Sequence, residues 1–257
     1  MADVRAVFVA LQPPPEGAVR GRTLVVIDTL RATTVLTTLL AGGAERVFPC
    51  ASIAEARALH QELPGAYLCG ERGGLPAEGF DFGNSPTEFA ALDVRGWTLV
   101  QATSNGTRAL ALTREAAHTI VACLRNRDAA AQAALEQPHD IAIVCSGEDD
   151  GQRPSLEDTF SAGAVVVRML RLEPELVLDS GARIAHKLFE AYGRSPAAAF
   201  DASPHAASLR TLQFDADLEF AAALDVESCV PRATLDATLD ANLHKAGRVV
   251  VAREEAP

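Results

Sequence analysis

Short apolar runs alternate along this chain with helical segments, and this pattern limits the fold more than any other feature. Runs such as TLVVID at 23–28 and DIAIVCS at 140–146 are apolar almost throughout, not at every second position. Strands of this kind are buried on both faces, as in a parallel sheet that helices cover on either side. We therefore predict an α/β fold of three layers, in which helices flank both faces of a mainly parallel or mixed sheet.

Helix starts are marked between these runs. Ser52, Ser85 and Ser155 each stand three positions before an acidic residue, which is the pattern of a capping box. In such a sheet, ligands bind in loops at the carboxyl ends of the strands, so functional residues are expected there. The predicted strands span 4–10, 23–28, 45–50, 66–70, 97–103, 118–123, 140–146 and 248–252.

The 257 residues are enough for one large domain or two small ones. The sequence contains no internal repeat and no low-complexity linker. Residues 1–257 are therefore predicted to form a single α/β unit, with two lobes and a boundary near 115–125 as the alternative. A break is expected at 193–204, and the chain from Leu176 to the last strand is expected to be helical.

Composition and charge argue against several classes of partner. The formal net charge of −11 and the pI near 5.0 imply no basic surface that could displace counterions from nucleic-acid phosphates. No apolar run is long enough to cross a bilayer, and no basic-then-apolar leader begins the chain. The five cysteines form no C-x-x-C pair. We expect a reduced, cytoplasmic protein with neither nucleic acid nor membrane as a partner.

The first candidate loop follows the predicted strand at 23–28, which ends on Asp28. A carboxylate at the end of a buried strand is a common metal ligand. Arg31 and the hydroxyls of Thr33 and Thr34 open a helix, and a helix start favours anions such as phosphate. The alternative, that Asp28 only caps the helix, is equally compatible with these residues.

The second candidate loop is the glycine-rich stretch CGERGGLPAEGFDFGNSP. A stretch this irregular is usually a flexible surface loop, yet it ends firmly at a helix start, where Asn84 and Ser85 stand. Its glycines allow the backbone to approach a ligand. Glu71 and Asp81 would then face a cation, and Arg72 would face an anion.

The third candidate loop is QATSNGTRAL, in which a predicted strand continues into Ser104 and Asn105. Gly106 allows close backbone approach, and Thr107 and Arg108 offer a hydroxyl and a guanidinium to an anion. Taken alone, such a segment is more often an ordinary turn.

The fourth candidate loop follows the predicted strand at 140–146. Ser146 and Gly147 are followed by the acids at 148–150, and then by Glu157 and Asp158 in the next helix start. Either group of acids could contribute metal ligands. The alternatives are a solvated loop face for 148–150 and a capping box for the helix start.

Together the four loops repeat one pattern, a carboxylate for a hard cation beside an arginine or a helix start for an anion. Mg²⁺ binds to a few carboxylates, water and substrate phosphate oxygens. The six histidines show no paired spacing for zinc, and neither a Walker motif nor a G-x-S-x-G elbow is present. Asp28 is not followed by a second aspartate two positions later, so a covalent aspartyl phosphate is not supported.

Five segments give the chain a family resemblance. IDTLRATT, GERGG…GFDFGNSP, TSNGTRAL, SLEDTFSAG and DLEFAAALDVESCVP occur in this order between about residues 23 and 231. In these segments the sequence resembles the 2-phosphosulfolactate phosphatase (ComB) family. The resemblance implies the three-layer fold of that family and a Mg²⁺-dependent hydrolase that removes phosphate from 2-phospho-3-sulfolactate, on a route toward coenzyme M.

The resemblance also suggests roles for the residues named above. The expected metal ligands are Asp28, Glu71 and Asp81, with Glu157 or Asp158. The residues expected to take part in catalysis are Asp28, Arg31, Glu71, Arg72, Asp81, Asn105 and Arg108. The expected substrate-binding residues are Arg31, Thr33, Thr34, Arg72, Asn84, Ser85, Ser104, Asn105, Gly106, Thr107, Arg108, Ser146 and Gly147.

Two alternatives to this function stay open. The same residues would serve a non-catalytic receptor for an anionic phosphometabolite. They would also serve a phosphatase for the phosphate ester of a different 2-hydroxy acid. In each case the partner is a small anionic phosphate compound, and a homo-oligomer is possible.

Overall fold

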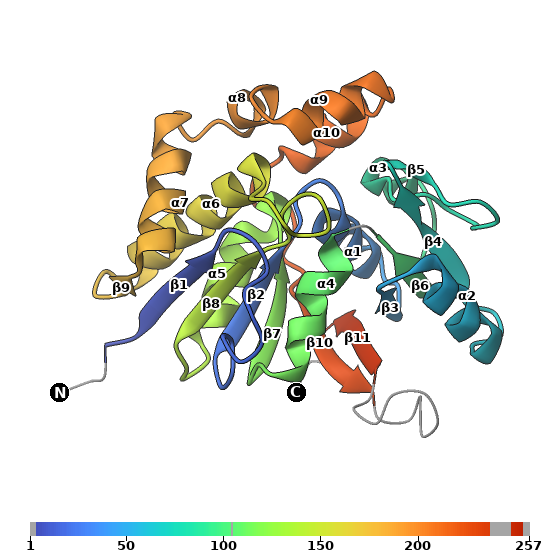
Figure 1. Ribbon diagram of the computed structural model, residues 1–257, viewed down its shortest axis with the longest axis horizontal. Helices are drawn as coiled ribbons and strands as arrows, with labels where there is room; N and C mark the ends of the chain where they lie inside the picture. Colours follow the sequence, from blue (N-terminus) through green and yellow to red (C-terminus); the bar gives the residue numbers. More distant parts are fainter. Residues whose placement is uncertain (1–3, 104, 237–247, 254–257) are drawn as a thin grey trace.

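The computed structural model describes residues 4–103, 105–236 and 248–253. Within them a large mixed sheet lies between helices on both faces, which confirms the predicted α/β fold (Figure 1). Each of the predicted strands is present, with ends within two residues of those expected. The strands are β1 (Ala6–Ala10), β2 (Thr23–Ile27), β3 (Arg46–Cys50), β4 (Tyr67–Arg72), β5 (Leu75–Pro76), β6 (Thr98–Ala102), β7 (His118–Ala122), β8 (Ile141–Cys145), β9 (Val177–Leu178), β10 (Pro231–Asp236) and β11 (Arg248–Arg253).

Three helices begin where serine caps predict them. The side chains of Ser52, Ser85 and Ser155 each accept the backbone N–H three residues later. The helices are α1 (Ala32–Ala41), α2 (Ile53–Glu62), α3 (Pro86–Ala90), α4 (Gly106–Ala111), α5 (Arg127–Leu135), α6 (Leu156–Leu172), α7 (Ser180–Ala191), α8 (Pro196–Asp201), α9 (Pro204–Thr211) and α10 (Asp215–Ala221), with single 3₁₀ turns at Leu112–Arg114 and Leu124–Asn126.

Two blocks of parallel strands make up the sheet. One block has the order β4-β6-β3 and the other has the order β7-β2-β8-β1-β9. Between them lies the antiparallel hairpin β10–β11, in which β10 pairs with β7 and β11 pairs with β3. The chain starts in the second block with β1 and β2, crosses to the first block at β3, and returns to the second between β6 and β7. The predicted lobe boundary near 115–125 stays a prediction.

One expectation for the last third of the chain is correct only in part. The chain after Leu176 forms α7 to α10 as expected, but it is not helical throughout, because β9 and β10 lie in it. Within 193–204, Ser195 and Ser203 each cap a helix that starts with proline, namely α8 and α9, and the break expected there stays a prediction. The sequence of β10, PRATLD, has no apolar run, and its strand conformation comes from pairing with β11.

The sheet is buried on both faces, as its apolar strands predict. Along β2, Leu24 and Val26 pack in a core beneath α1, whereas Val25 and Ile27 pack in a second core with α5 and α6. Val25 lies opposite Ile120 of β7 on one side and Ile143 of β8 on the other. Alternate residues of one strand therefore fill two cores, which explains the wholly apolar pattern.

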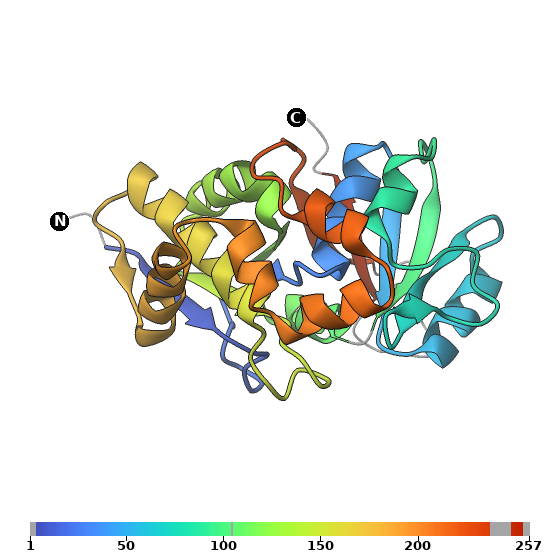
Figure 2. The same cartoon turned by 90° about the horizontal axis from the view of Figure 1, so that it is seen from above.

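Helices α8, α9 and α10, here called the roof helices, cross above the middle of the molecule between α7 and α3 (Figures 1 and 2). Phe200 of α8, Leu209 of α9 and Leu218 of α10 share a core with Leu30, which follows β2. This core fixes the roof helices over the end of β2. Across the described part of the chain, no helix combines the length and the apolar character that a membrane crossing needs.

Candidate active site

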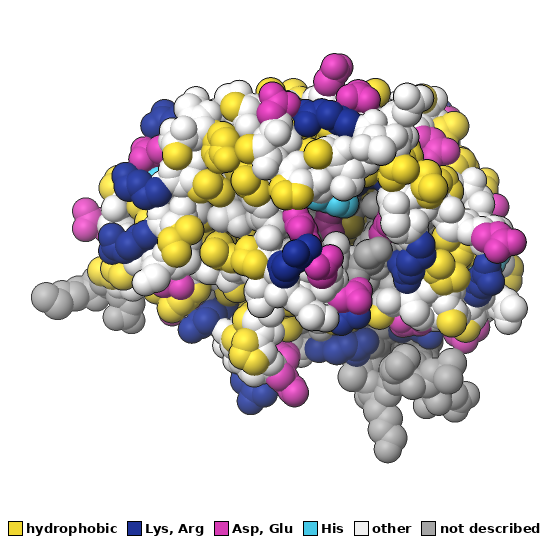
Figure 3. Space-filling model, turned by 45° about the horizontal axis from the view of Figure 1, so that its top comes forward, with side chains coloured by type: hydrophobic (Ala, Val, Ile, Leu, Met, Phe, Trp, Pro, Cys, Tyr) yellow, Lys and Arg dark blue, Asp and Glu magenta, His cyan; other side chains and the backbone are white. Residues whose placement is uncertain are grey.

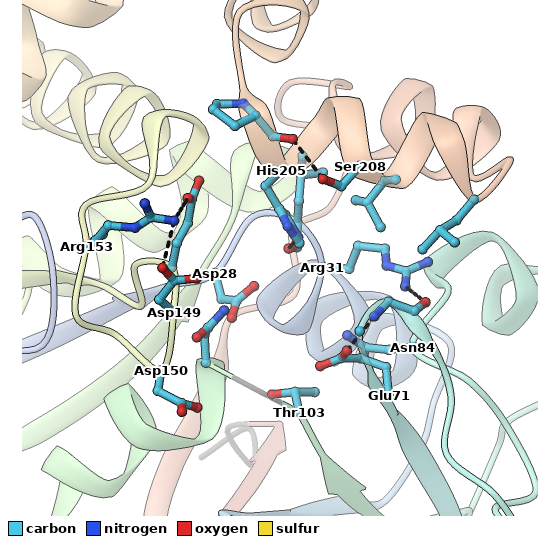
Figure 4. Close-up of a pocket in the computed structure, with 18 residues that line it drawn as sticks. Asp28, Arg31, Glu71, Asn84, Thr103, Asp149, Asp150, Arg153, His205 and Ser208 are labelled. Carbon is cyan, nitrogen blue, oxygen red and sulfur yellow. Dashed lines mark hydrogen bonds and ion pairs between the residues drawn. The ribbon is translucent and has the colours of Figure 1, made fainter.

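A cavity of about 580 Å³ lies below the roof helices, where loops from the ends of β2, β4, β6 and β8 come together. Figure 3 shows a hollow at the centre of this face, with acidic, basic and histidine side chains around it. In Figure 4, Arg153 and Asp149 lie on one side of the cavity and Glu71 and Asn84 on the other. The lining residues are Asp28, Leu30, Arg31, Glu71, Gly73, Gly74, Asn84, Thr103, Asn105, Glu148, Asp149, Asp150, Arg153, Pro204, His205, Ser208, Leu209 and Leu212.

Asp28 lies at the end of β2, between the two sides of the cavity (Figure 4). Its carboxylate accepts the N–H of Ala32 at 3.1 Å, so it caps α1 as well as facing the cavity. Gly106, the first residue of α4, packs directly against it. A Cβ at position 106 would lie 2.8 Å from Oδ2 of Asp28, so only glycine allows the backbone of α4 this close.

Burial raises the pKa of Asp28 above its ordinary value, and the negative charge of Glu71 adds to this effect. Burial, followed by the charges of Asp28 and Glu157, also raises the pKa of Asp158 well above its ordinary value. No ion pair neutralises Asp28 within the described ranges. A cation in the cavity would therefore favour the ionised form of these carboxyl groups.

Arg31 contributes a buried positive charge to the cavity wall. Its Nη1 donates to Asp217 at 2.6 Å, in an ion pair whose side chains are 2% and 1% exposed. Its Nη2 donates to the carbonyl of Gly74 at 2.7 Å, and its guanidinium stacks on the ring of Phe214 at 4.1 Å. Arg31 therefore connects β2, the glycine-rich loop and α10 in one network.

Two residues of the glycine-rich loop, Glu71 and Asn84, line the cavity. Glu71 is 8% exposed, and its Oε2 accepts the N–H of Gly74 at 2.9 Å. Asn84 accepts a hydrogen bond from the amide of Gln101 at 3.1 Å. Both side chains come to the wall that lies opposite Asp149 (Figure 4).

Arg72 and Asp81 are not among the residues that line the cavity. Arg72 is exposed and donates to the carbonyl of Glu71 at 2.9 Å. The carboxylate of Asp81 accepts the N–H of Leu68 at 2.8 Å, so it stabilises the loop backbone. Phe82 packs among the rings of Tyr67, Phe89 and Trp97 and fixes the loop to the body of the protein.

Four of the predicted hydroxyl residues stabilise backbone or side chains behind the cavity. Three of their hydroxyls donate to main-chain carbonyls at 2.7 to 3.3 Å, and the fourth, that of Ser85, donates to Asp217 at 2.7 Å. These residues are Thr33, Thr34, Ser85 and Thr107. The predicted site residue Ser104 lies outside the described residues.

The end of β6 presents polar atoms to the cavity. The hydroxyl of Thr103 and Oδ1 of Asn105 are buried, and neither has a hydrogen-bond partner in the described part of the chain. Buried polar atoms are almost always satisfied, so such atoms at a cavity wall point to a ligand or to bound water. Arg108, on the next turn, is about half exposed and lies 3.4 Å from Asp150.

The fourth loop enters the site differently from what was expected. Glu148, Asp149 and Asp150 line the cavity, and the side chains of Asp149 and Asp150 are also 62% and 57% exposed, as expected for a solvated loop face. Asp158 instead lies behind the cavity. Its carboxylate accepts hydrogen bonds from Ser146 and Gly147, at 3.0 and 3.3 Å, and from the N–H of Thr29 at 2.8 Å.

The roof helices bring residues that sequence reasoning missed. His205 of α9 lines the cavity above Asp28 (Figure 4), and its Nε2 lies 2.8 Å from the carbonyl oxygen of Leu30. Because a carbonyl oxygen only accepts, Nε2 donates, and in the neutral ring Nδ1 is then the acceptor. Just before α9, Ser203 donates to Glu157 at 2.7 Å, and Glu157 is likewise not among the lining residues.

Neither His205 nor Asp217 carries a signal by which the sequence alone could have assigned its role. His205 has no ligand spacing to another histidine. Asp217 lies in the DLEF segment that contributes to the family resemblance, yet only the fold shows that it binds Arg31, Ser85 and Thr87.

The cavity fits a hard cation by the chemistry of its donors. In the described ranges, no three His, Cys, Asp or Glu side chains stand together as a protein cage for a metal. Mg²⁺ does not need such a cage, because it keeps waters and binds one or two carboxylates together with substrate phosphates. Asp28 and Glu71 offer oxygen donors of this kind at the cavity wall.

Comparison with known proteins gives a consistent result. A sequence model described as 2-phosphosulpholactate phosphatase matches residues 10–235. A relative from Synechococcus sp. is 41% identical over 213 residues, covering 80% of this chain and 87% of its own length. A relative from Deinococcus radiodurans is 39% identical over 209 residues, or 80% of this chain and 85% of its own. A relative from Thermotoga petrophila is 39% identical over 217 residues, covering 84% of this chain and 91% of its own length. All three are named probable 2-phosphosulfolactate phosphatase.

Proposed function

The chain belongs to the 2-phosphosulfolactate phosphatase family and is a phosphoric monoester hydrolase, and we propose that it hydrolyses 2-phospho-3-sulfolactate to 3-sulfolactate and phosphate with Mg²⁺ as cofactor. The observation that carries the proposal is the meeting of Asp28, Glu71 and Arg31 at one cavity. Two desolvated carboxylates beside a buried guanidinium form a site for a cation and an anion together, which is what a phosphate ester with its metal requires.

Asp28 and Glu71 are the residues that would hold Mg²⁺. Bound there, the ion would polarise the phosphoryl group and offset the negative charge of the substrate and of the carboxylates. Asp81, Glu157 and Asp158 were also expected as ligands. Their carboxylates accept hydrogen bonds from Leu68, Ser203 and Thr29, so the proposal rests on the two acids that line the cavity.

The chain's own groups would orient the substrate and move the proton. The guanidinium of Arg31, fixed by Asp217, supplies a preorganised positive charge for an oxyanion. In hydrolysis a water oxygen bonds to phosphorus while the bond from phosphorus to the C2 oxygen breaks. One proton must leave the water and one must reach the C2 oxygen. Because Nε2 of His205 donates to Leu30, Nδ1 would accept the first proton and release it to the C2 oxygen.

Further parts of the proposal concern the cellular setting. The five cysteines are free and buried, which suits the reducing cytoplasm. The acidic charge of the chain gives no support to a nucleic acid as the partner. The product 3-sulfolactate would enter a route toward coenzyme M.

Release of inorganic phosphate from a panel of phosphomonoesters tests the proposal. The panel contains 2-phospho-3-sulfolactate and esters of 2-hydroxy acids without a sulfonate, each assayed with Mg²⁺ and with chelator. We expect the highest kcat/KM for 2-phospho-3-sulfolactate, and loss of turnover with chelator that Mg²⁺ restores. Release from esters without a sulfonate only would assign another substrate, and no release from any ester would favour a receptor.

A further inference from the structure

The charge of the cavity wall conflicts with the charge of an anionic ligand. Among its described lining residues, five carboxylates face two guanidiniums. A phosphate ester that carries further acidic groups would meet net repulsion, which a single divalent cation offsets only in part. The positive charges of the wall therefore offset part of this repulsion.

The two arginines of the wall differ in how firmly they are held. Arg31 is buried and donates to Asp217 and to a main-chain carbonyl, so it cannot turn to a new partner without leaving a buried charge unpaired. Arg153 is 65% exposed, and its guanidinium lies 2.7 Å from Asp149 and 3.8 Å from Glu148. Ion pairs this exposed contribute little to stability, so an incoming anion can replace one of their partners.

The loop backbone sets this pair in place. Glu148 and Arg153 exchange N–H to carbonyl hydrogen bonds of 2.8 and 3.2 Å, which closes a tight turn at the cavity rim. Asp149 and Asp150 have φ of 50° and 57°, a left-handed conformation that asparagine and aspartate tolerate better than most residues. The turn thus holds Asp149 beside Arg153 at the side of the cavity opposite Glu71 (Figure 4).

We propose that Arg153 is a substrate-binding residue, which forms an ion pair with Asp149 in the ligand-free protein. When the substrate binds, one of its oxyanions replaces Asp149 as the partner of Arg153. This inference rests on the proposed function for the identity of the substrate. A phosphoryl or sulfonate group offers several oxygens to a guanidinium, and the arginine forms charge-assisted hydrogen bonds with either. Asp149 thereby lowers the affinity for anions, because each binding event must break its pair with Arg153.

Asp150 provides a matched control within the same turn. It also lines the cavity and has a left-handed backbone, but its arginine partner is Arg108, at 3.4 Å. Asp149→Asn and Asp150→Asn each remove one negative charge from the same wall, and asparagine keeps the backbone conformation. Asp149→Asn releases Arg153, whereas Asp150→Asn releases Arg108, so only the first change should show coupling to Arg153.

The test is a double-mutant cycle on the KM for 2-phospho-3-sulfolactate in the presence of Mg²⁺. The variants are Asp149→Asn, Asp150→Asn and Arg153→Gln, with each aspartate change also made in the Arg153→Gln protein. We expect Arg153→Gln to raise KM about tenfold, and Asp149→Asn to lower KM about two- to fivefold. In the Arg153→Gln protein, the gain from Asp149→Asn should shrink to the general effect of removing one charge.

Asp150→Asn should change KM by the same factor whether or not Arg153 is present. An equal effect of Asp149→Asn in both backgrounds would overturn the inference, and so would an unchanged KM in Arg153→Gln. Arg153→Lys keeps the positive charge but lacks the planar set of guanidinium donors. It should therefore reverse only part of the rise in KM that Arg153→Gln causes. Circular dichroism of every variant checks that the fold is retained.

A second readout separates failure of this inference from failure of the proposed function. Binding of inorganic phosphate, measured by calorimetry on the same variants, needs no turnover. If the wild-type protein releases no phosphate from the ester, the proposed substrate is wrong. The double-mutant cycle on phosphate binding still tests whether Arg153 exchanges Asp149 for an anion. Coupling between Asp149 and Arg153 in that cycle supports the inference, and absence of coupling overturns it.

Discussion

At the scale of single residues, Asp28 combines two tasks that often fall to separate groups. Its carboxylate caps α1 through the N–H of Ala32 and also faces the cavity. The sequence left a cap and a ligand open as alternatives, and the structure allows both at once because one carboxylate has more than one acceptor site. Burial raises its pKa, and α4 packs against it at Gly106.

Asp28→Asn is expected to lower Mg²⁺-dependent turnover by at least about a hundredfold, because the amide carries no charge for the cation. The cap should persist, since the asparagine oxygen can still accept from Ala32. Phosphate release from 2-phospho-3-sulfolactate measures this effect. Asp93→Asn, which changes an exposed aspartate paired with Arg95, serves as the control and should keep full activity. Near-normal turnover in Asp28→Asn would contradict the proposal that Asp28 binds the metal.

The raised pKa of Asp28 predicts a sign for the pH dependence of stability. The carboxyl group of Asp28 binds its proton more tightly in the folded protein than in the unfolded chain. Asp28 therefore destabilises the fold least at pH values below its ordinary pKa near 3.8. The free energy of unfolding of the wild type, relative to Asp28→Asn, should fall as pH rises above that value, in the presence of chelator. Urea unfolding between pH 4 and pH 8 measures the difference.

Asp93 should show the opposite sign, because hydrogen bonds from Arg95 lower its pKa to about 2. Its contribution is present above the ordinary pKa and is lost as pH falls toward 2. If the free energy of unfolding of the wild type, relative to that of Asp28→Asn, rose with pH, the explanation given for Asp28 would be contradicted.

His205→Gln tests the proton-transfer role of the histidine. The glutamine amide can still donate to the carbonyl of Leu30, but it cannot take up a proton. We expect kcat to fall about 10²- to 10⁴-fold with little change in KM. His186→Gln on α7, outside the cavity lining, is the control and should leave both constants unchanged. Equal kcat in His205→Gln and the wild type would leave His205 as a structural contact.

At the scale of elements, α10 acts on the site through one side chain. Asp217 is 1% exposed and accepts from Arg31 of the β2 loop and from Ser85 and Thr87 at the start of α3. These contacts hold the roof helices, the first loop and the glycine-rich loop together. The firm end of the glycine-rich loop, which the sequence signals as Asn-Ser-Pro, therefore depends on a helix more than a hundred residues away.

Asp217→Asn is expected to destabilise the fold by about 3 kcal/mol, because it leaves the buried guanidinium of Arg31 without a counter-charge. It should also raise KM, since Arg31 loses the partner that orients it. Chemical denaturation and phosphate release measure the two effects. Asp215→Asn on the same helix changes an exposed side chain and should cost less than about 0.5 kcal/mol. Equal stability of the two variants would contradict a structural role for the ion pair.

At the scale of the whole molecule, the β10–β11 hairpin joins the two parallel blocks of the sheet. Val251 of β11 is fully buried and lies opposite Ala233 of β10 and Val47 of β3. The cavity draws residues from both blocks, Asp28 from one and Glu71 from the other. The relative position of the blocks therefore determines whether the site exists.

Val251→Ala should lower the free energy of unfolding by about 2 kcal/mol, from lost burial and the space that remains. Val226→Ala, at a side chain that is 55% exposed, should change it by less than about 0.5 kcal/mol. Urea unfolding followed by circular dichroism and by the fluorescence of Trp97 measures both. A loss below 0.5 kcal/mol for Val251→Ala would argue against a coupling role for the hairpin.

The strands and the serine-capped helices could be predicted from the sequence because both depend on neighbouring residues. Wholly apolar runs specify strands that are covered on two sides, and Ser52, Ser85 and Ser155 specify helix starts through bonds within one turn. For the same local reason, Asp28, Arg31, Glu71, Asn84 and Asn105 could be named at strand ends before the cavity was known.

Tertiary structure alone decided the rest. It turned Asp81 toward the N–H of Leu68, placed Asp158 behind the cavity, and brought His205 and Asp217 from the last third of the chain to the end of β2. It also made a strand of β10 through pairing with β11. The physical reason is distance along the chain: local patterns fix which residues form a strand or a cap. Which carboxylates share a cavity depends instead on burial and on hydrogen bonds between distant segments, and no local pattern records those.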